Sequence, residues 1–234
     1  MLFVIASLQR KKEQAVLRGS WLSAALLFLY AIAFSFAYLS LGAGTGALIL
    51  FGSVQLTLIV LALRNGERPR AWEWTGLMLA LGGLVYLVLP GLSAPAPLGS
   101  ALMTLAGMAW GFYTLRGRGS KDPLGDTAGN FVYSVPMTLL VRLVSFSNVH
   151  VSMKGIALAA ASGALASGVG YVIWYAALRG LTTTRAAAVQ LSVPVLAAWG
   201  GVLFLAEDVS MRLLLAGALI LGGIALSVAG RGRA

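Results

Sequence analysis

Residues 174–207 read WYAALRGLTTTRAAAVQLSVPVLAAWGGVLFLAE, and no charge separates Arg185 from the closing Glu207. A similar stretch stands at residues 37–67, AYLSLGAGTGALILFGSVQLTLIVLALRNGE, and it also ends on a glutamate. Uncharged apolar runs of about 20 residues are long enough to cross a bilayer as helices. The two stretches therefore predict membrane-spanning helices and raise the prospect of an internal repeat.

The composition of the chain excludes an ordinary soluble domain. Of its 234 residues, 59% are hydrophobic and only 10% are charged, whereas soluble domains carry about 25% charged residues. The apolar runs are continuous and lack the alternation of a membrane β-barrel. The chain has no cysteine and therefore no disulfide or thiolate site. We therefore predict an all-α membrane protein.

Eight segments are long and apolar enough to span a membrane, and the loops between them are too short to hold a soluble domain. The predicted spans are 21–41, 44–63, 71–90, 98–115, 127–146, 155–178, 186–205 and 212–230.

The positive charges indicate the orientation of these spans, because cytoplasmic loops collect Lys and Arg. With the N-terminus inside and eight spans, 14 of the 17 basic residues fall inside, Lys154 and Arg212 fall outside, and Arg142 lies near an outer helix end. This split predicts that both termini are cytoplasmic. It also explains the net charge of +10 without nucleic acid, for which no basic soluble segment exists.

The chain matches itself when it is shifted by about 140 positions. Glu67 then aligns with Glu207, and the Gly-Gly pair at 82–83 aligns with the pair at 222–223; we expect these glycines to let helices approach closely. The repeating unit contains five helices, so its two copies must be inverted relative to each other. Inverted repeats around a central site are typical of secondary transporters.

The repeat divides the chain into residues 1–90, a partial first copy, and residues 98–230, a complete second copy. Residues 1–7, MLFVIAS, align with residues 140–146 at the end of a helix. We therefore expect the chain to lack the first helix of the first repeat and most of the second.

The second copy resembles the EamA-type transporters of the drug/metabolite transporter superfamily. The landmarks of the resemblance are Ala177-Leu178, Ala186–Ala188, Pro194-Val195, Gly201, Glu207, Gly217 and Gly222-Gly223. The first copy departs from the pattern, since Gln55 replaces the proline. The resemblance implies two inverted five-helix repeats in the inner membrane. It also implies export or exchange of small metabolites, such as amino acids, by alternating access.

The titratable residues do not support an enzyme. All seven carboxylates and the single histidine, His150, lie in loops or within a turn of a helix end. Catalysis inside the membrane needs a nucleophile with its base, or metal ligands, around a cavity. We therefore expect no catalytic residue, metal or cofactor. The lack of a carboxylate at membrane depth favours uniport or exchange over proton antiport.

Three aromatic residues are candidates for the wall of a solute cavity. Tyr171 and Trp174 share one helix face with Tyr175 at a spacing of three and four residues. They either bind an amphiphilic solute or form the aromatic belt at the membrane interface. Trp110 is a third candidate, whereas its neighbour Tyr113 fits the interface better.

Two amides and a proline are the polar candidates. Gln55 lies near the middle of its helix, and Gln190 lies about one turn into another. A buried amide needs hydrogen bonds, which a neighbouring helix or a solute can provide. Pro194 frees a backbone carbonyl and serves as a hinge, as a packing kink or as a contact for the solute.

Together these features predict a multi-pass carrier of amino-acid-like or amphiphilic solutes in the inner membrane. The alternative is a non-transporting membrane protein, either a partner subunit or a truncated remnant of a transporter. The expected partners are a small-molecule solute and the lipid bilayer. Association with a second copy or with another chain stays open.

Overall fold

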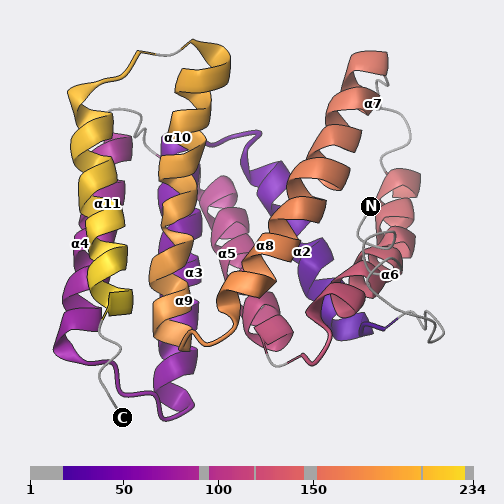
Figure 1. Cartoon of the computed structure of the whole chain (residues 1–234). Helices are drawn as coiled ribbons and strands as arrows, with labels where there is room; N and C mark the ends of the chain where they lie inside the picture. The colour runs from indigo at the N-terminus through magenta and orange to yellow at the C-terminus, as the bar shows by residue number, and fades with distance from the viewer. Residues whose placement is uncertain (1–17, 90–94, 119, 145–151, 207, 230–234) are drawn as a thin grey trace. The chain divides into compact units, whose positions relative to one another are not determined.

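The computed structural model describes residues 18–89, 95–118, 120–144, 152–206 and 208–229, and over these residues it contains helices and connecting segments but no strand. Figure 1 shows the helices. They are α2 (Trp21–Ala37), α3 (Ala43–Arg64), α4 (Ala71–Val88), α5 (Pro97–Arg118), α6 (Pro123–Val144), α7 (Met153–Ala160), the π-helix η3 (Ala161–Ser167), α8 (Gly168–Leu178), α9 (Thr183–Gln190), α10 (Ser192–Leu205) and α11 (Met211–Ala229).

A helix lies at each of the eight predicted spans, as expected for an all-helical membrane protein, but α2 and α6 are not among the described helices long and apolar enough to cross a membrane. Within the described residues, six helices are long and apolar enough to cross a membrane when α7–α8 and α9–α10 each count as one. The segment predicted at 98–115 is a 22-residue helix, α5, and α2 ends earlier than expected, at Ala37. Three landmarks of the sequence lie outside the described residues, namely residues 1–7, His150 and Glu207.

The chain forms two compact units. Unit 1 consists of Met1–Leu29 and Phe112–Gly180, and unit 2 consists of Tyr30–Gly111 and Leu181–Ala234. This division differs from that of the sequence repeats, because each unit takes helices from both copies. The candidate site residues are therefore distributed over the two units.

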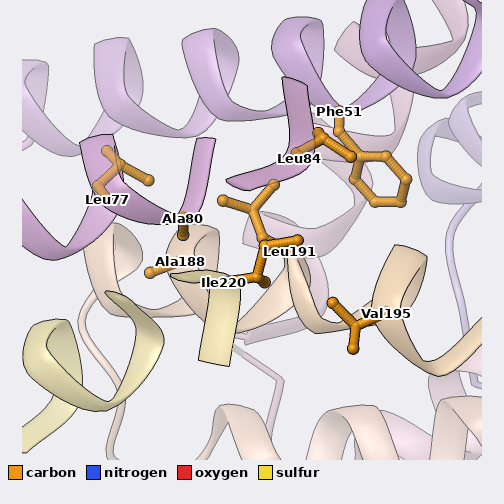
Figure 2. Close-up of a cluster of buried hydrophobic side chains, with 8 residues drawn as sticks. All are labelled: Phe51, Leu77, Ala80, Leu84, Ala188, Leu191, Val195 and Ile220. Atoms are coloured by element: carbon orange, nitrogen blue, oxygen red, sulfur yellow. The ribbon is translucent and has the colours of Figure 1, made fainter. Parts of the chain in front are cut away.

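The core of unit 2 lies among α3, α4, α9, α10 and α11. Figure 2 shows eight buried side chains of this core, which are Phe51, Leu77, Ala80, Leu84, Ala188, Leu191, Val195 and Ile220. Lipid tails are as apolar as these side chains, so the hydrophobic effect contributes little to such contacts in a bilayer. Close packing between the helices stabilises them instead.

Glycines bring α4 and α11 into close contact, and the two helices lie side by side in Figure 1. A Cβ added to Gly223 would lie 2.5 Å from the carbonyl oxygen of Gly76 and 2.7 Å from the amide nitrogen of Ala80. Gly83 likewise leaves only 2.8 Å for a Cβ next to the Ile220 side chain. The expectation for the other glycine of each pair is wrong, because Gly82 and Gly222 face open space.

A turn at Leu191 separates α9 from α10. Pro194 has no amide hydrogen and cannot donate to the carbonyl of Gln190, four residues earlier, which favours a kink or a break in the helix at this point. The amide of Leu191 donates to Ala188 O at 3.0 Å, three residues back. The turn therefore changes the normal pairing of the carbonyls at the end of α9.

Candidate functional site

Unit 1 contains a polar pocket with a volume of about 330 Å³. It lies where the start of α2, the end of α5, the start of α6 and the end of α8 meet. Its lining residues are Gly19, Ser20, Ser23, Tyr113, Arg116, Gly117, Ser120, Pro123, Asp126, Thr127, Asn130 and Tyr175. None of the six site residues predicted from the sequence is among them.

A chain of hydrogen bonds holds one wall of this pocket. The side-chain oxygen of Asn130 accepts a bond of 2.9 Å from the backbone amide of Ser20. Its side-chain nitrogen donates to the Tyr113 hydroxyl at 3.5 Å, and that hydroxyl donates to Thr127 Oγ1 at 3.5 Å. Asn130, Tyr113 and Thr127 are all buried. These hydrogen bonds hold the polar wall of the pocket in place.

Charges of opposite sign line the same pocket. Arg116 donates from Nε to Ser23 Oγ at 3.0 Å and from Nη2 to Ser20 Oγ at 3.4 Å. Asp126, in the first turn of α6, accepts a hydrogen bond from the hydroxyl of Ser120. The serines fix the orientation of both charged groups.

The aromatic residues of α8 lie in a cluster of unit 1. Tyr171 is buried, with its ring centroid 5.5 Å from that of Phe131 and 6.1 Å from that of Tyr113, both edge to face. Trp174 is partly buried, and its indole N–H has no hydrogen-bond partner among the described residues. Tyr175 reaches the polar pocket, whereas Tyr171 packs behind it.

Gln55 lies in unit 2, at the contact between α3 and α9. Its side chain is 2% exposed, and Nε2 donates to the carbonyl oxygen of Ala187 at 2.8 Å. Since the Leu191 amide bonds to Ala188 instead, the carbonyl of Ala187 is available to accept this bond. The other polar atom of Gln55, Oε1, is buried and has no partner in the described part of the chain.

The three other predicted residues of unit 2 lie nearby in sequence or in space. Trp110 packs against the buried cluster of Val54, Leu58 and Ala187, and its ring centroid is 4.9 Å from that of Tyr30. Gln190 closes α9 and is 5% exposed. Its Oε1 atom is also buried without a partner among the residues described. Pro194 lies in the first turn of α10.

A group of charged and hydroxyl residues surrounds the start of α9 in unit 2. Glu67 accepts hydrogen bonds from the backbone amides of Thr183 and Thr184, at 2.8 and 3.2 Å. Burial raises the pKa of Glu67, but the hydrogen bonds from both threonines outweigh it, and the pKa lies below its ordinary value. Arg185 forms an ion pair of 2.8 Å with the buried Glu73. These contacts attach the α3–α4 connection to α9.

Two pairs of polar residues in the sequence are a signal for this pocket. Tyr113 and Arg116 are three residues apart on α5, and Asp126 and Asn130 are four residues apart on α6, so each pair shares a helix face. Their position at helix ends is equally typical of the membrane interface. In the part of the chain that the structure describes, no group of three His, Asp or Glu residues is placed to hold a metal ion.

Comparison with known proteins places this fold. Residues 97–229 match the model of the EamA-like transporter family. The uncharacterized protein PA1977 of Pseudomonas aeruginosa is 52% identical over 235 aligned residues, which cover all of this chain and 82% of that protein. A protein of known crystal structure shares the fold, with a TM-score of 0.77, 21% identity and coverage of 97% of this chain and 82% of the other. The chain therefore belongs to the EamA-like transporter family of membrane proteins, as the resemblance in its second half predicted.

Proposed function

We propose that this protein carries a small metabolite across the inner membrane by alternating access, in the direction of export or in exchange. The observation that carries the proposal is the pair of buried amide oxygens, Gln55 Oε1 and Gln190 Oε1, which find no donor among the described residues. Leaving a buried acceptor unpaired costs about 1–3 kcal/mol. Both acceptors lie in unit 2 of a protein that belongs to a family of membrane transporters. A ligand that donates hydrogen bonds to them explains why they are buried without a partner.

The contacts between α4 and α11 support the inverted repeat that alternating access requires. Gly223 meets Ala80, and Gly83 meets Ile220. Gly83 and Gly223 are 140 positions apart, as are Ala80 and Ile220, so each contact is the counterpart of the other under the sequence repeat. Gly82 and Gly222 are also counterparts, and both face open space. Two equivalent halves of opposite orientation provide two half-paths that open to opposite sides.

The distribution of Lys and Arg supports the proposed orientation, with both termini in the cytoplasm. In this orientation the end of α5, with Arg116 and Arg118, lies on the cytoplasmic side, and so does the polar pocket of unit 1. The start of α9, with Glu67 and Arg185, lies on the same side.

Counterflow into proteoliposomes tests the proposal. Purified protein is reconstituted with a concentrated amino acid inside, and uptake of the labelled amino acid is measured over a panel. We expect accelerated uptake of at least one member. We also expect that Gln55→Leu and Gln190→Leu reach the membrane in normal amounts but lose this flux, because leucine cannot accept a hydrogen bond.

Thr75→Leu serves as the matched control, since Thr75 is an exposed residue of α4 whose hydroxyl donates to the carbonyl of Ala71 in its own helix. This variant should transport normally. Unchanged flux in both glutamine variants would remove these residues from the solute path. No flux above that of empty liposomes, for any solute of the panel, would count against a carrier.

A further inference from the structure

We infer that the polar pocket of unit 1 is a recognition site for a small zwitterion, with Arg116 binding its carboxylate and Asp126 its ammonium group. This inference rests on the proposed carrier function, because it names the class of solute. It goes beyond that function by assigning a site outside the six residues expected from the sequence. The pocket, its two charges and its hydroxyl groups provide the evidence.

Arg116 is positioned to bind an anion. Its guanidinium is held by Ser23 and Ser20 through Nε and Nη2, and the structure records no carboxylate paired with it among the described residues. A guanidinium has five N–H donors in a planar fork that fits a carboxylate. The two serines occupy only part of this fork, and the rest is available to a ligand in the pocket.

Asp126 is positioned to bind a cation. The hydroxyl of Ser120 donates to its Oδ2 atom, and no hydrogen bond to Oδ1 is recorded from any residue that the structure describes. A carboxylate accepts bonds at both oxygens. An ammonium group has three donors and suits this acceptor together with the neighbouring hydroxyl of Thr127.

The two charges are not paired with each other by a direct contact. Arg116 and Asp126 both line the pocket, yet between these two described residues the structure records no ion pair. A ligand with a single charge would satisfy one group and leave the other without a counter-charge. A zwitterion satisfies both, and charge complementarity of this kind discriminates between ligands.

The rest of the lining sets the size and character of the solute. A volume of about 330 Å³ is at the low end of the range of roughly 300–1,000 Å³ for small-molecule sites. Tyr113 and Tyr175 offer ring surface as well as hydroxyl groups, and both are buried. The pocket therefore suits a compact zwitterion with a polar or aromatic side chain.

Binding measurements on the purified full-length chain in nanodiscs test the inference with three matched forms of each probe. L-serine, L-leucine and L-phenylalanine are each compared with their amide, which lacks the carboxylate, and their N-acetyl derivative, which lacks the ammonium group. We expect at least one free amino acid to bind about tenfold or more tightly than both of its derivatives, the difference expected from one charge-assisted interaction.

Variants then assign each charge to its residue. Arg116→Gln should weaken binding of the free amino acid about tenfold and change binding of its amide by less than about twofold, and Arg116→Lys should recover part of the loss. Asp126→Asn should weaken binding of the free amino acid and the amide but spare the N-acetyl form. Lys121→Gln and Asp208→Asn are matched controls, since both residues are exposed and lie outside the pocket.

The possible outcomes test the zwitterion site and the carrier function independently. Equal affinity for the three forms, binding of none of them, or normal binding by both pocket variants would overturn the zwitterion site. Amino acid flux that Arg116→Gln and Asp126→Asn leave unchanged would also overturn it, while the carrier function would stand. Charge-selective binding in the absence of any flux would support the site and count against carriage.

Discussion

The Oε1 atom of Glu67 accepts a hydrogen bond of 2.8 Å from the backbone amide of Thr183, the first residue of α9. The other carboxylate oxygen of Glu67 accepts from the amide and the hydroxyl of Thr184 at 3.2 Å. The first amides of a helix have no partner within the helix, and a negative charge is favourable there. Glu67 therefore caps a helix that begins 116 residues further along the chain.

Replacement of Glu67 by Gln should destabilise the protein at neutral pH and not in acid. The pKa of Glu67 in the folded protein lies below its ordinary value of 4.5, so its charge stabilises the folded state fully at pH values above 4.5. This contribution is lost as the pH falls through the lower folded pKa. We expect a cost of about 1 kcal/mol at pH 7, modest because Glu67 is partly exposed.

Thermal unfolding in detergent at pH 7 and at pH 3 measures this effect as the difference between the variant and the wild type. The difference should shrink at pH 3, because lowering the pH below 4.5 moves it toward the folded pKa of Glu67 and protonates more of the wild-type carboxyl. Asp208→Asn, at an exposed position, should show no comparable change. An equal difference at both pH values would mean that the charge of Glu67 does not stabilise α9.

The ion pair of Arg185 and Glu73 predicts partial rescue by charge exchange. The side chains are only 15% and 7% exposed, so removal of either partner leaves a largely buried charge. Glu73→Ala should cost about 3 kcal/mol, the low end of the range for buried pairs. The double variant Glu73→Arg/Arg185→Glu restores the pair, but arginine cannot accept the 2.8 Å hydrogen bond that Glu73 now receives from the amide of Arg70.

We therefore expect the exchanged variant to lie between the wild type and the single variants in thermal stability. A double-mutant cycle with Glu73→Gln, which keeps an acceptor for that amide, separates the contribution of the ion pair from that of the hydrogen bond to the Arg70 amide. If the exchanged variant loses as much stability as the two single changes together, the ion pair contributes nothing.

The glycines of α4 and α11 allow substitutions at the close helix contact to be compared with control substitutions elsewhere on the same two helices. Gly76→Ala and Gly223→Ala should each destabilise the protein by about 1–3 kcal/mol, since the new Cβ would meet the backbone of the facing helix and force the helices apart. Gly82→Ala and Gly222→Ala add a methyl group in open space and should be neutral or slightly stabilising, because alanine favours a helix. Apparent melting temperatures of the four variants test this, and similar losses in all four would refute the close contact.

The sequence predicts the helices of this protein well because the bilayer imposes a simple rule of length and apolar content. The same rule explains why the polar pocket was missed. Arg116 and Asp126 lie at helix ends, where charged residues are expected at any membrane interface, and only the fold brings them to one pocket. The position of Gln55 near the middle of its helix predicts a buried amide, but the sequence does not predict its partner, because the turn at Leu191 leaves the carbonyl of Ala187 without its usual helical donor.

Pro194 and Gln55 should therefore be coupled, although no contact between them is required. Pro194→Ala restores the amide that can donate to the carbonyl of Gln190, which favours a continuous helix through α9 and α10. In such a helix the amide of Leu191 would bond to the carbonyl of Ala187, four residues back. Gln55 would then share the acceptor of its 2.8 Å hydrogen bond with that amide, which weakens the bond.

A double-mutant cycle on stability and on counterflow measures this coupling. Gln55→Leu should cost about 1 kcal/mol in the wild-type background, where it removes a buried hydrogen bond, and less in the Pro194→Ala background, where that bond is weakened. The flux of the Pro194→Ala variant should fall, because the side chain of Gln55 is held less firmly in place. Thr75→Leu in both backgrounds provides the control for an unrelated polar position. Strictly additive effects of Pro194→Ala and Gln55→Leu would show that the turn at Leu191 does not govern the position of Gln55.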